Sequence, residues 1–114
     1  MINLRVATEP GAQIEASAAA AKAAGLIFIH LPFNAAAPDP SLVDRFLAAI
    51  SDPKNQPAFI HCASGNRAAA LWMVKRMVVD TWDAERAFEE ATALGMSAGL
   101  RPFVLEQATA RLRP

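Results

Sequence analysis

The feature that most constrains this chain is a regular alternation of short apolar runs with longer helical patterns. Three runs rich in β-branched and aromatic residues predict strands at residues 2–6, 26–31 and 58–61. Helical patterns separate the runs and continue after the last of them. Such alternation is typical of parallel strands joined by right-handed crossovers. The sequence therefore predicts an α/β fold, with a central and mainly parallel sheet flanked by helices.

The helical patterns carry their own start and stop signals. Asp39 and Asp83 are predicted N-caps, because each carboxylate can accept a hydrogen bond from a backbone N–H of the first turn. Gly25 and Gly95 are predicted C-terminal caps. The segment 68–79 is apolar nearly all round, which is typical of a helix inside the domain. The predicted helices span residues 13–24, 40–50, 68–79, 84–94 and 102–112.

Length and composition limit the function classes. A chain of 114 residues fits one domain, predicted here to span residues 1–114. Eleven basic residues balance eleven acidic ones, so no footprint for nucleic acid or an anionic membrane is present. The start of the chain lacks the pattern of a signal peptide, and no apolar run is long enough to span a membrane. One cysteine fits a reducing compartment, so we expect a cytoplasmic protein whose oligomeric state the sequence leaves open.

The segment at residues 61–67 reads His-Cys-Ala-Ser-Gly-Asn-Arg and joins a predicted strand to a predicted helix. A chain that turns sharply into a helix aims several backbone N–H groups at one point, where the helix dipole adds about half a positive charge. Cys62 would then be a stabilised thiolate and Arg67 a two-pronged donor to an oxyanion. Gly65 permits a backbone conformation that a side chain would forbid. The predicted anion-binding residues are Ala63, Ser64, Gly65, Asn66 and Arg67.

The alternative for Cys62 is a small hydrophobe buried at a strand end, which the full motif makes the weaker interpretation. His61 precedes Cys62 on the strand and points to the other face, so we expect a supporting group rather than an acid or base.

Three segments together resemble a known family: Ile-Asn-Leu-Arg at residues 2–5, His-Leu-Pro at residues 30–32, and the motif at residues 61–67. They are similar to the phosphatase-like domain of beta-lactamase hydrolase-like proteins, within the dual-specificity and protein-tyrosine-phosphatase superfamily. The resemblance implies a tyrosine-phosphatase-like fold. It also implies Cys62 as nucleophile and Arg67 as phosphate clamp, with no metal or organic cofactor. A phosphatase needs a general acid, which in this superfamily is an Asp on a loop beyond an earlier strand. Asp39 is the candidate here, although its capping role is the stronger prediction, and Glu9 is a weaker candidate.

The chain departs from that pattern in three places. Four residues separate Cys62 from Arg67, where phosphatases of this superfamily usually have five, and the shorter loop is similar to that of rhodanese-type sulfurtransferases. Ala68 stands where phosphatases commonly have Ser or Thr. The family normally has residues ahead of the first strand, so an N-terminal strand of its sheet would be absent here.

Three functions follow from these observations. The first is a cysteine-dependent phosphatase-like hydrolase that forms a cysteinyl-phosphate on a phosphorylated or other anionic small substrate. The second is a sulfurtransferase that carries a persulfide on Cys62. The third is a non-catalytic module that binds anions or phosphopeptides.

Overall fold

A computed structural model describes residues 1–37 and 39–112 of the chain. The alternation predicted from the sequence is confirmed, and so are the parallel strands. The elements in chain order are β1 (Ile2–Asn3), α1 (Ile14–Ala23), β2 (Ile29–His30), α2 (Pro40–Ser51), η1 (Pro53–Asn55), β3 (Ile60–His61), α3 (Asn66–Val78), α4 (Ala84–Ala93), η2 (Ala98–Leu100) and α5 (Arg101–Leu112).

The sheet has the order β2-β1-β3, and β1 pairs in parallel with both neighbours. Asn3 of β1 lies opposite His30 on one side and opposite His61 on the other. Side chains in register across parallel strands point to the same face of the sheet. A row of three polar side chains therefore crosses one face of the sheet, at the carboxyl ends of its strands.

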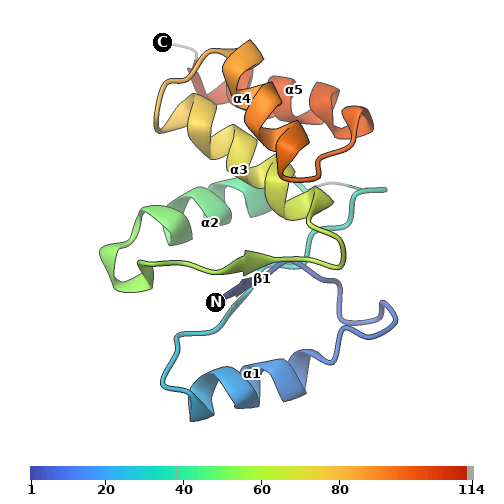
Figure 1. Cartoon of the computed structure of the whole chain (residues 1–114), viewed down its shortest axis with the longest axis vertical. Coiled ribbons are helices and arrows are strands. Elements are labelled where there is room, and N and C mark those ends of the chain that lie inside the picture. Colours follow the sequence, from blue (N-terminus) through green and yellow to red (C-terminus); the bar gives the residue numbers. More distant parts are fainter. Residues whose placement is uncertain (38, 113–114) are drawn as a thin grey trace. The chain divides into compact units, whose positions relative to one another are not determined.

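The described residues divide into two compact units, and the first is Met1–Ala63. In this unit α1 lies on one side of the sheet and α2 on the other (Figure 1). That arrangement is the one right-handed crossovers produce when the second crossover passes over the central strand. The amphipathic α2 follows the Asp39-Pro40 start signal, and its buried residues are Leu42, Val43, Phe46 and Ile50.

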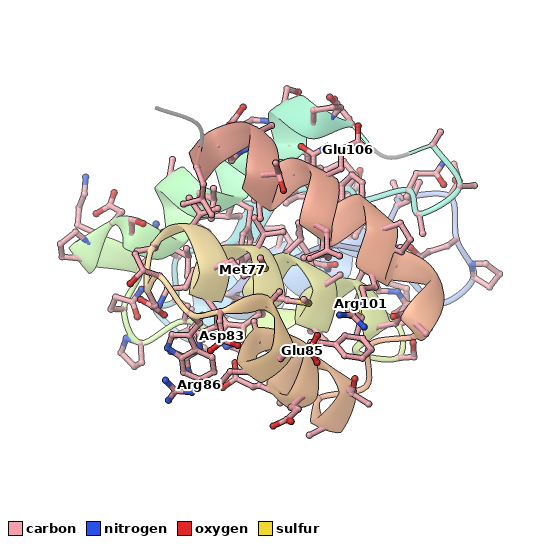
Figure 2. All side chains as sticks on the ribbon, turned by 90° about the horizontal axis from the view of Figure 1, so that it is seen from above. Met77, Asp83, Glu85, Arg86, Arg101 and Glu106 are labelled. Carbon is pink, nitrogen blue, oxygen red and sulfur yellow. The ribbon has the colours of Figure 1, made fainter. Side chains whose placement is uncertain are left out.

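The second unit begins at Ser64 and contains α3, α4 and α5, in which α3 packs against both other helices. Figure 2 shows Arg101, at the start of α5, turned toward Glu85 of α4, and their side chains form an ion pair at 3.0 Å. Arg76 of α3 forms a second tie to α4, because its guanidinium bonds the Glu90 carboxylate at 2.9 Å. The fully buried α3 side chains are Ala70, Leu71, Met73 and Val74.

Several boundaries differ from the sequence predictions. Regular pairing covers only two residues in each strand, although further bonds, such as Leu4 N–H to the His61 carbonyl at 2.8 Å, continue the alignment. Helix α3 begins two residues earlier than predicted, so Arg67 lies in its first turn. No helix in the described ranges is long and apolar enough to cross a membrane.

Candidate functional site

The predicted nucleophile follows β3 directly. Bonds from the Ile2 amide to the Phe59 carbonyl (2.7 Å) and from the Leu4 amide to the His61 carbonyl (2.8 Å) fix this strand against β1. Cys62 is half-buried and begins the loop that leaves the carboxyl end of the strand. The carboxyl ends of parallel strands are where α/β sheets usually bind ligands.

Gly65 sets the conformation of the loop where it enters α3. Its φ of 90° and ψ of −12° lie in the left-handed region that side chains disfavour. A Cβ at this position would lie 3.4 Å from the carbonyl oxygen of Leu94. The requirement for glycine predicted from the motif is therefore confirmed in the backbone.

A second segment braces the loop inside the same unit. The side-chain oxygen of Asn66 accepts a hydrogen bond of 2.7 Å from the backbone N–H of Ser97. A Cβ on Gly95 would lie 3.7 Å from the Ser64 carbonyl, so the turn after α4 runs close to the loop. Nothing in the spacing of Asn66 and Ser97 indicates that they meet, so this contact could not be predicted from the sequence.

The N-terminus of α3 differs from those of its neighbours. Asp39 caps α2 by accepting from Ser41 N–H, and Asp83 caps α4 by accepting from Arg86 N–H. For α3 the cap position is Gly65, which has no side chain to act as a cap, and the first turn of the helix holds no acidic residue. No acidic residue of this turn therefore offsets the helix dipole, and Arg67 of the same turn carries a positive charge.

His61 occupies the face of the sheet that carries Asn3. Its ring stacks on Phe59 with centroids 5.4 Å apart and planes 28° from parallel. Burial lowers the pKa of His61, and the nearby Arg5 charge lowers it further, while a hydrogen bond to the Cys62 backbone acts in the opposite direction. His61 is therefore a neutral ring in contact with the backbone of the predicted nucleophile.

Asp39 is an N-cap, as its sequence context predicts. Its Oδ1 accepts the Ser41 N–H at 2.9 Å, and this bond is the main cause that lowers the pKa of the carboxyl. The residue is exposed. A carboxylate held in this way is ionised at neutral pH, which opposes its use as a proton donor.

Glu9, the weaker acid candidate, belongs to a different hydrogen-bonded turn. Its carboxylate accepts from Val6 N–H at 2.6 Å and from Arg5 Nε at 3.3 Å. The Arg5 guanidinium also donates to the Pro10 carbonyl at 2.6 Å. Glu9 and Arg5 together fold the loop after β1.

Two crystal structures have the same fold as this chain, and both are of a Shewanella putrefaciens CN-32 protein described as "Putative phosphatase (DUF442)". The first superposes with a TM-score of 0.78 at 18% identity and covers 96% of this chain and 72% of its own. The second gives a TM-score of 0.75 at 19% identity and covers 97% and 69%. No curated protein matches the chain.

The class of fold is thus that of a phosphatase-like α/β protein. The family model for the beta-lactamase hydrolase-like protein, phosphatase-like domain, matches residues 1–79, which include the whole motif at residues 61–67. The chain belongs to this family, as the resemblance of its three segments predicted.

Proposed function

We propose that this phosphatase-like domain is a cysteine-dependent hydrolase that cleaves phosphate monoesters. The observation that carries the proposal is the motif at residues 61–67, which runs from the carboxyl end of β3 into the N-terminus of α3. Three features support it: the glycine conformation at Gly65, the first turn of α3 without an acidic residue, and the match to a phosphatase-like family. Backbone N–H groups and a guanidinium are the donors that proteins use for phosphate.

In the first step the Cys62 thiolate attacks phosphorus. A sulfur–phosphorus bond forms while the bond from phosphorus to the ester oxygen breaks, and the leaving oxygen takes a proton. Arg67 and the loop amides hold the equatorial oxygens, on which charge accumulates in the transition state. The product of this step is a cysteinyl-phosphate and a free alcohol.

In the second step water attacks the cysteinyl-phosphate. The sulfur–phosphorus bond breaks, the thiolate returns, and inorganic phosphate leaves. Asp39 is the proposed proton donor of the first step and acceptor of the second. Because its capping bond lowers the pKa of Asp39, we expect hydrolysis of esters with poor leaving groups to become faster as the pH falls below 7.

The expected substrate is a phosphorylated or other anionic small molecule, and the chemistry requires no metal or organic cofactor. The balanced charge argues against nucleic acid and membrane partners. The single cysteine supports a reducing, cytoplasmic setting.

A sulfurtransferase is the second candidate, favoured by the four residues between Cys62 and Arg67. Here the thiolate attacks the outer sulfur of thiosulfate, the sulfur–sulfur bond breaks, and sulfite leaves. The persulfide on Cys62 then gives its outer sulfur to a nucleophile such as cyanide. No alkoxide forms, so this reaction needs no general acid, in agreement with an ionised Asp39.

One paired assay separates the candidates. The wild type and the Cys62→Ser and Arg67→Ala variants are tested for hydrolysis of an aryl phosphate and for sulfur transfer from thiosulfate to cyanide. Arg86→Ala is the matched control, since Arg86 is exposed on α4 and stacks on Trp82 at 3.7 Å. The proposal predicts phosphate hydrolysis that both loop variants abolish and the control retains.

Faster turnover of thiosulfate than of any phosphate ester would establish the sulfurtransferase instead. Phosphate binding by the wild type, measured by calorimetry, with neither activity would establish a non-catalytic anion-binding or phosphopeptide-binding module. Retention of hydrolysis in Cys62→Ser would refute the cysteine mechanism.

A further inference from the structure

Two buried polar atoms remain without a hydrogen-bond partner within the described residues, and they lie on neighbouring strands. They are Nδ2 of Asn3 and Nε2 of His61. Asn3 is fully buried, with 0% of its surface exposed. An unsatisfied buried polar group costs about 1–3 kcal/mol, so native proteins rarely leave a donor and an acceptor unpaired side by side.

The chemistry of the two atoms is complementary. The Asn3 side-chain oxygen accepts the Arg5 N–H at 2.9 Å, so the free end of its amide is the donating NH2 group. The His61 ring bonds the Cys62 backbone, and because Nε2 is the unpartnered nitrogen, that contact uses Nδ1. A ring that donates from Nδ1 to a carbonyl presents an accepting lone pair at Nε2.

Register brings the donor and the acceptor to one face of the sheet. Asn3 and His61 are paired residues of the parallel strands β1 and β3. Adjacent strands lie about 4.8 Å apart, and paired side chains point the same way. The Phe59 ring stacked on His61 restricts the orientation of the imidazole.

We infer that the Asn3 amide donates to His61 Nε2 through one bridging water, and so holds His61 as the Nδ1–H tautomer that orients the Cys62 backbone. Asn3 is then a positioning residue for the nucleophile, and this role rests on the function proposed for Cys62. The neighbouring His30 provides a contrast, because its Nε2 bonds the Arg5 carbonyl at 2.6 Å and must carry the hydrogen. The two histidines of the chain are thus expected in opposite tautomers.

Nitrogen-15 NMR of the whole chain at pH 7.5 tests the inference without any activity measurement. Long-range proton–nitrogen correlations distinguish the two neutral tautomers of each ring. We expect Nδ1–H for His61 and Nε2–H for His30. An Nε2–H or charged His61 in the wild type would overturn the inference.

Two variants separate this role from the second role of Asn3, whose side-chain oxygen supports the turn at Arg5 by accepting its N–H. Asn3→Asp keeps the oxygen that accepts from Arg5 N–H but replaces the donor, whereas Asn3→Leu removes both. Both variants should move His61 away from the Nδ1–H tautomer and slow Cys62 alkylation at pH 6.5 by about tenfold. In metal sites, loss of a residue that hydrogen-bonds to a ligating side chain lowers affinity or activity by at least about this factor. Phe59→Leu is the control, because it removes the stacking ring and no donor, and it should leave the tautomer unchanged.

If His61 stays Nδ1–H in a folded Asn3→Asp or Asn3→Leu variant, Asn3 supports only the turn and the inference is wrong. The tautomers decide the inference, whereas hydrolysis by the wild type decides the proposed function. An inactive wild type with the expected tautomers would refute the catalytic proposal and leave the hydrogen-bonded pair established.

Discussion

Replacement of Gly65 by alanine tests whether the conformation of the loop serves anion binding. The left-handed region costs a non-glycine residue about 1–2 kcal/mol. The new Cβ would lie 3.4 Å from the Leu94 carbonyl oxygen, at the near edge of ordinary contact, so crowding adds little to that cost. Unfolding entropy of about 2.1 cal/mol/K per residue converts the loss into a Tm lower by about 4–8 °C for this chain.

The chain provides two matched controls for this substitution. Gly25 has a φ of 76°, and a Cβ there would meet nothing within 4 Å, so Gly25→Ala should lose about as much stability as Gly65→Ala. Gly99 has no positive φ, and its nearest neighbour to a new Cβ is Ser97 Oγ at 3.8 Å. Gly99→Ala should therefore change the Tm little. The three variants separate conformational strain from position in the fold.

Only Gly65→Ala should weaken phosphate binding. If the loop of Gly65→Ala adopts an unstrained conformation, phosphate binding must restore the strained one at a cost of about 1–2 kcal/mol. This cost corresponds to about a 5- to 30-fold higher Kd for phosphate. Isothermal titration calorimetry gives the Kd and differential scanning calorimetry gives the Tm. Equal phosphate affinity in Gly65→Ala and the wild type, or equal loss of affinity in Gly25→Ala, would refute the reasoning.

Three further predictions concern single charged groups. Asp39→Asn should slow hydrolysis of alkyl phosphates by about a hundred-fold or more, and hydrolysis of activated aryl phosphates much less. The Tm should not change, because Asn also caps helices. Unaltered alkyl-phosphate hydrolysis would mean that Asp39 is only a cap. Cys62 should be alkylated well below pH 8, and Arg67→Ala should move the midpoint of its pH profile upward; a wild-type profile like that of a free thiol would contradict an activated nucleophile. Bonds from Lys75 and Arg76 lower the pKa of Asp80, so its stabilisation is present above about pH 4 and is lost as the pH falls through the lowered value. Asp80→Asn should thus cost about 0.5–1 kcal/mol at pH 7 and less at pH 2.5, measured by urea unfolding at both pH values.

Much of the local structure could be predicted because its causes are local. Asp39 and Asp83 cap their helices as their contexts indicate, since a side chain reaches a backbone N–H only two or three residues away. Gly25 and Gly95 take positive φ angles after α1 and α4, because the residue that ends a helix often adopts the left-handed conformation that glycine favours. The order of strands and helices also follows from the periodicity of apolar residues.

Other features could not be predicted because distant residues decide them. Large aromatic side chains usually anchor a core, yet Trp72 and Trp82 are both half-buried and lie against cations. The Arg76 guanidinium lies 4.2 Å from the centre of the Trp82 ring, and Trp72 Nε1 donates to Glu90 at 2.8 Å. The packing of α3 on α4 brings these groups together, and no spacing in the sequence reveals it.

The candidate site also combines features set by consecutive residues with features set by distant residues. The sequence by itself determined the motif at residues 61–67, its place between a strand and a helix, and the need for glycine at position 65, because these depend on consecutive residues. Only the tertiary structure decided that Asn66 accepts from Ser97 and that the amide of Asn3 lies in register with the ring of His61. Such contacts join segments 31 and 58 residues apart in the chain, and only parallel pairing and helix packing bring segments that distant into hydrogen-bonding range.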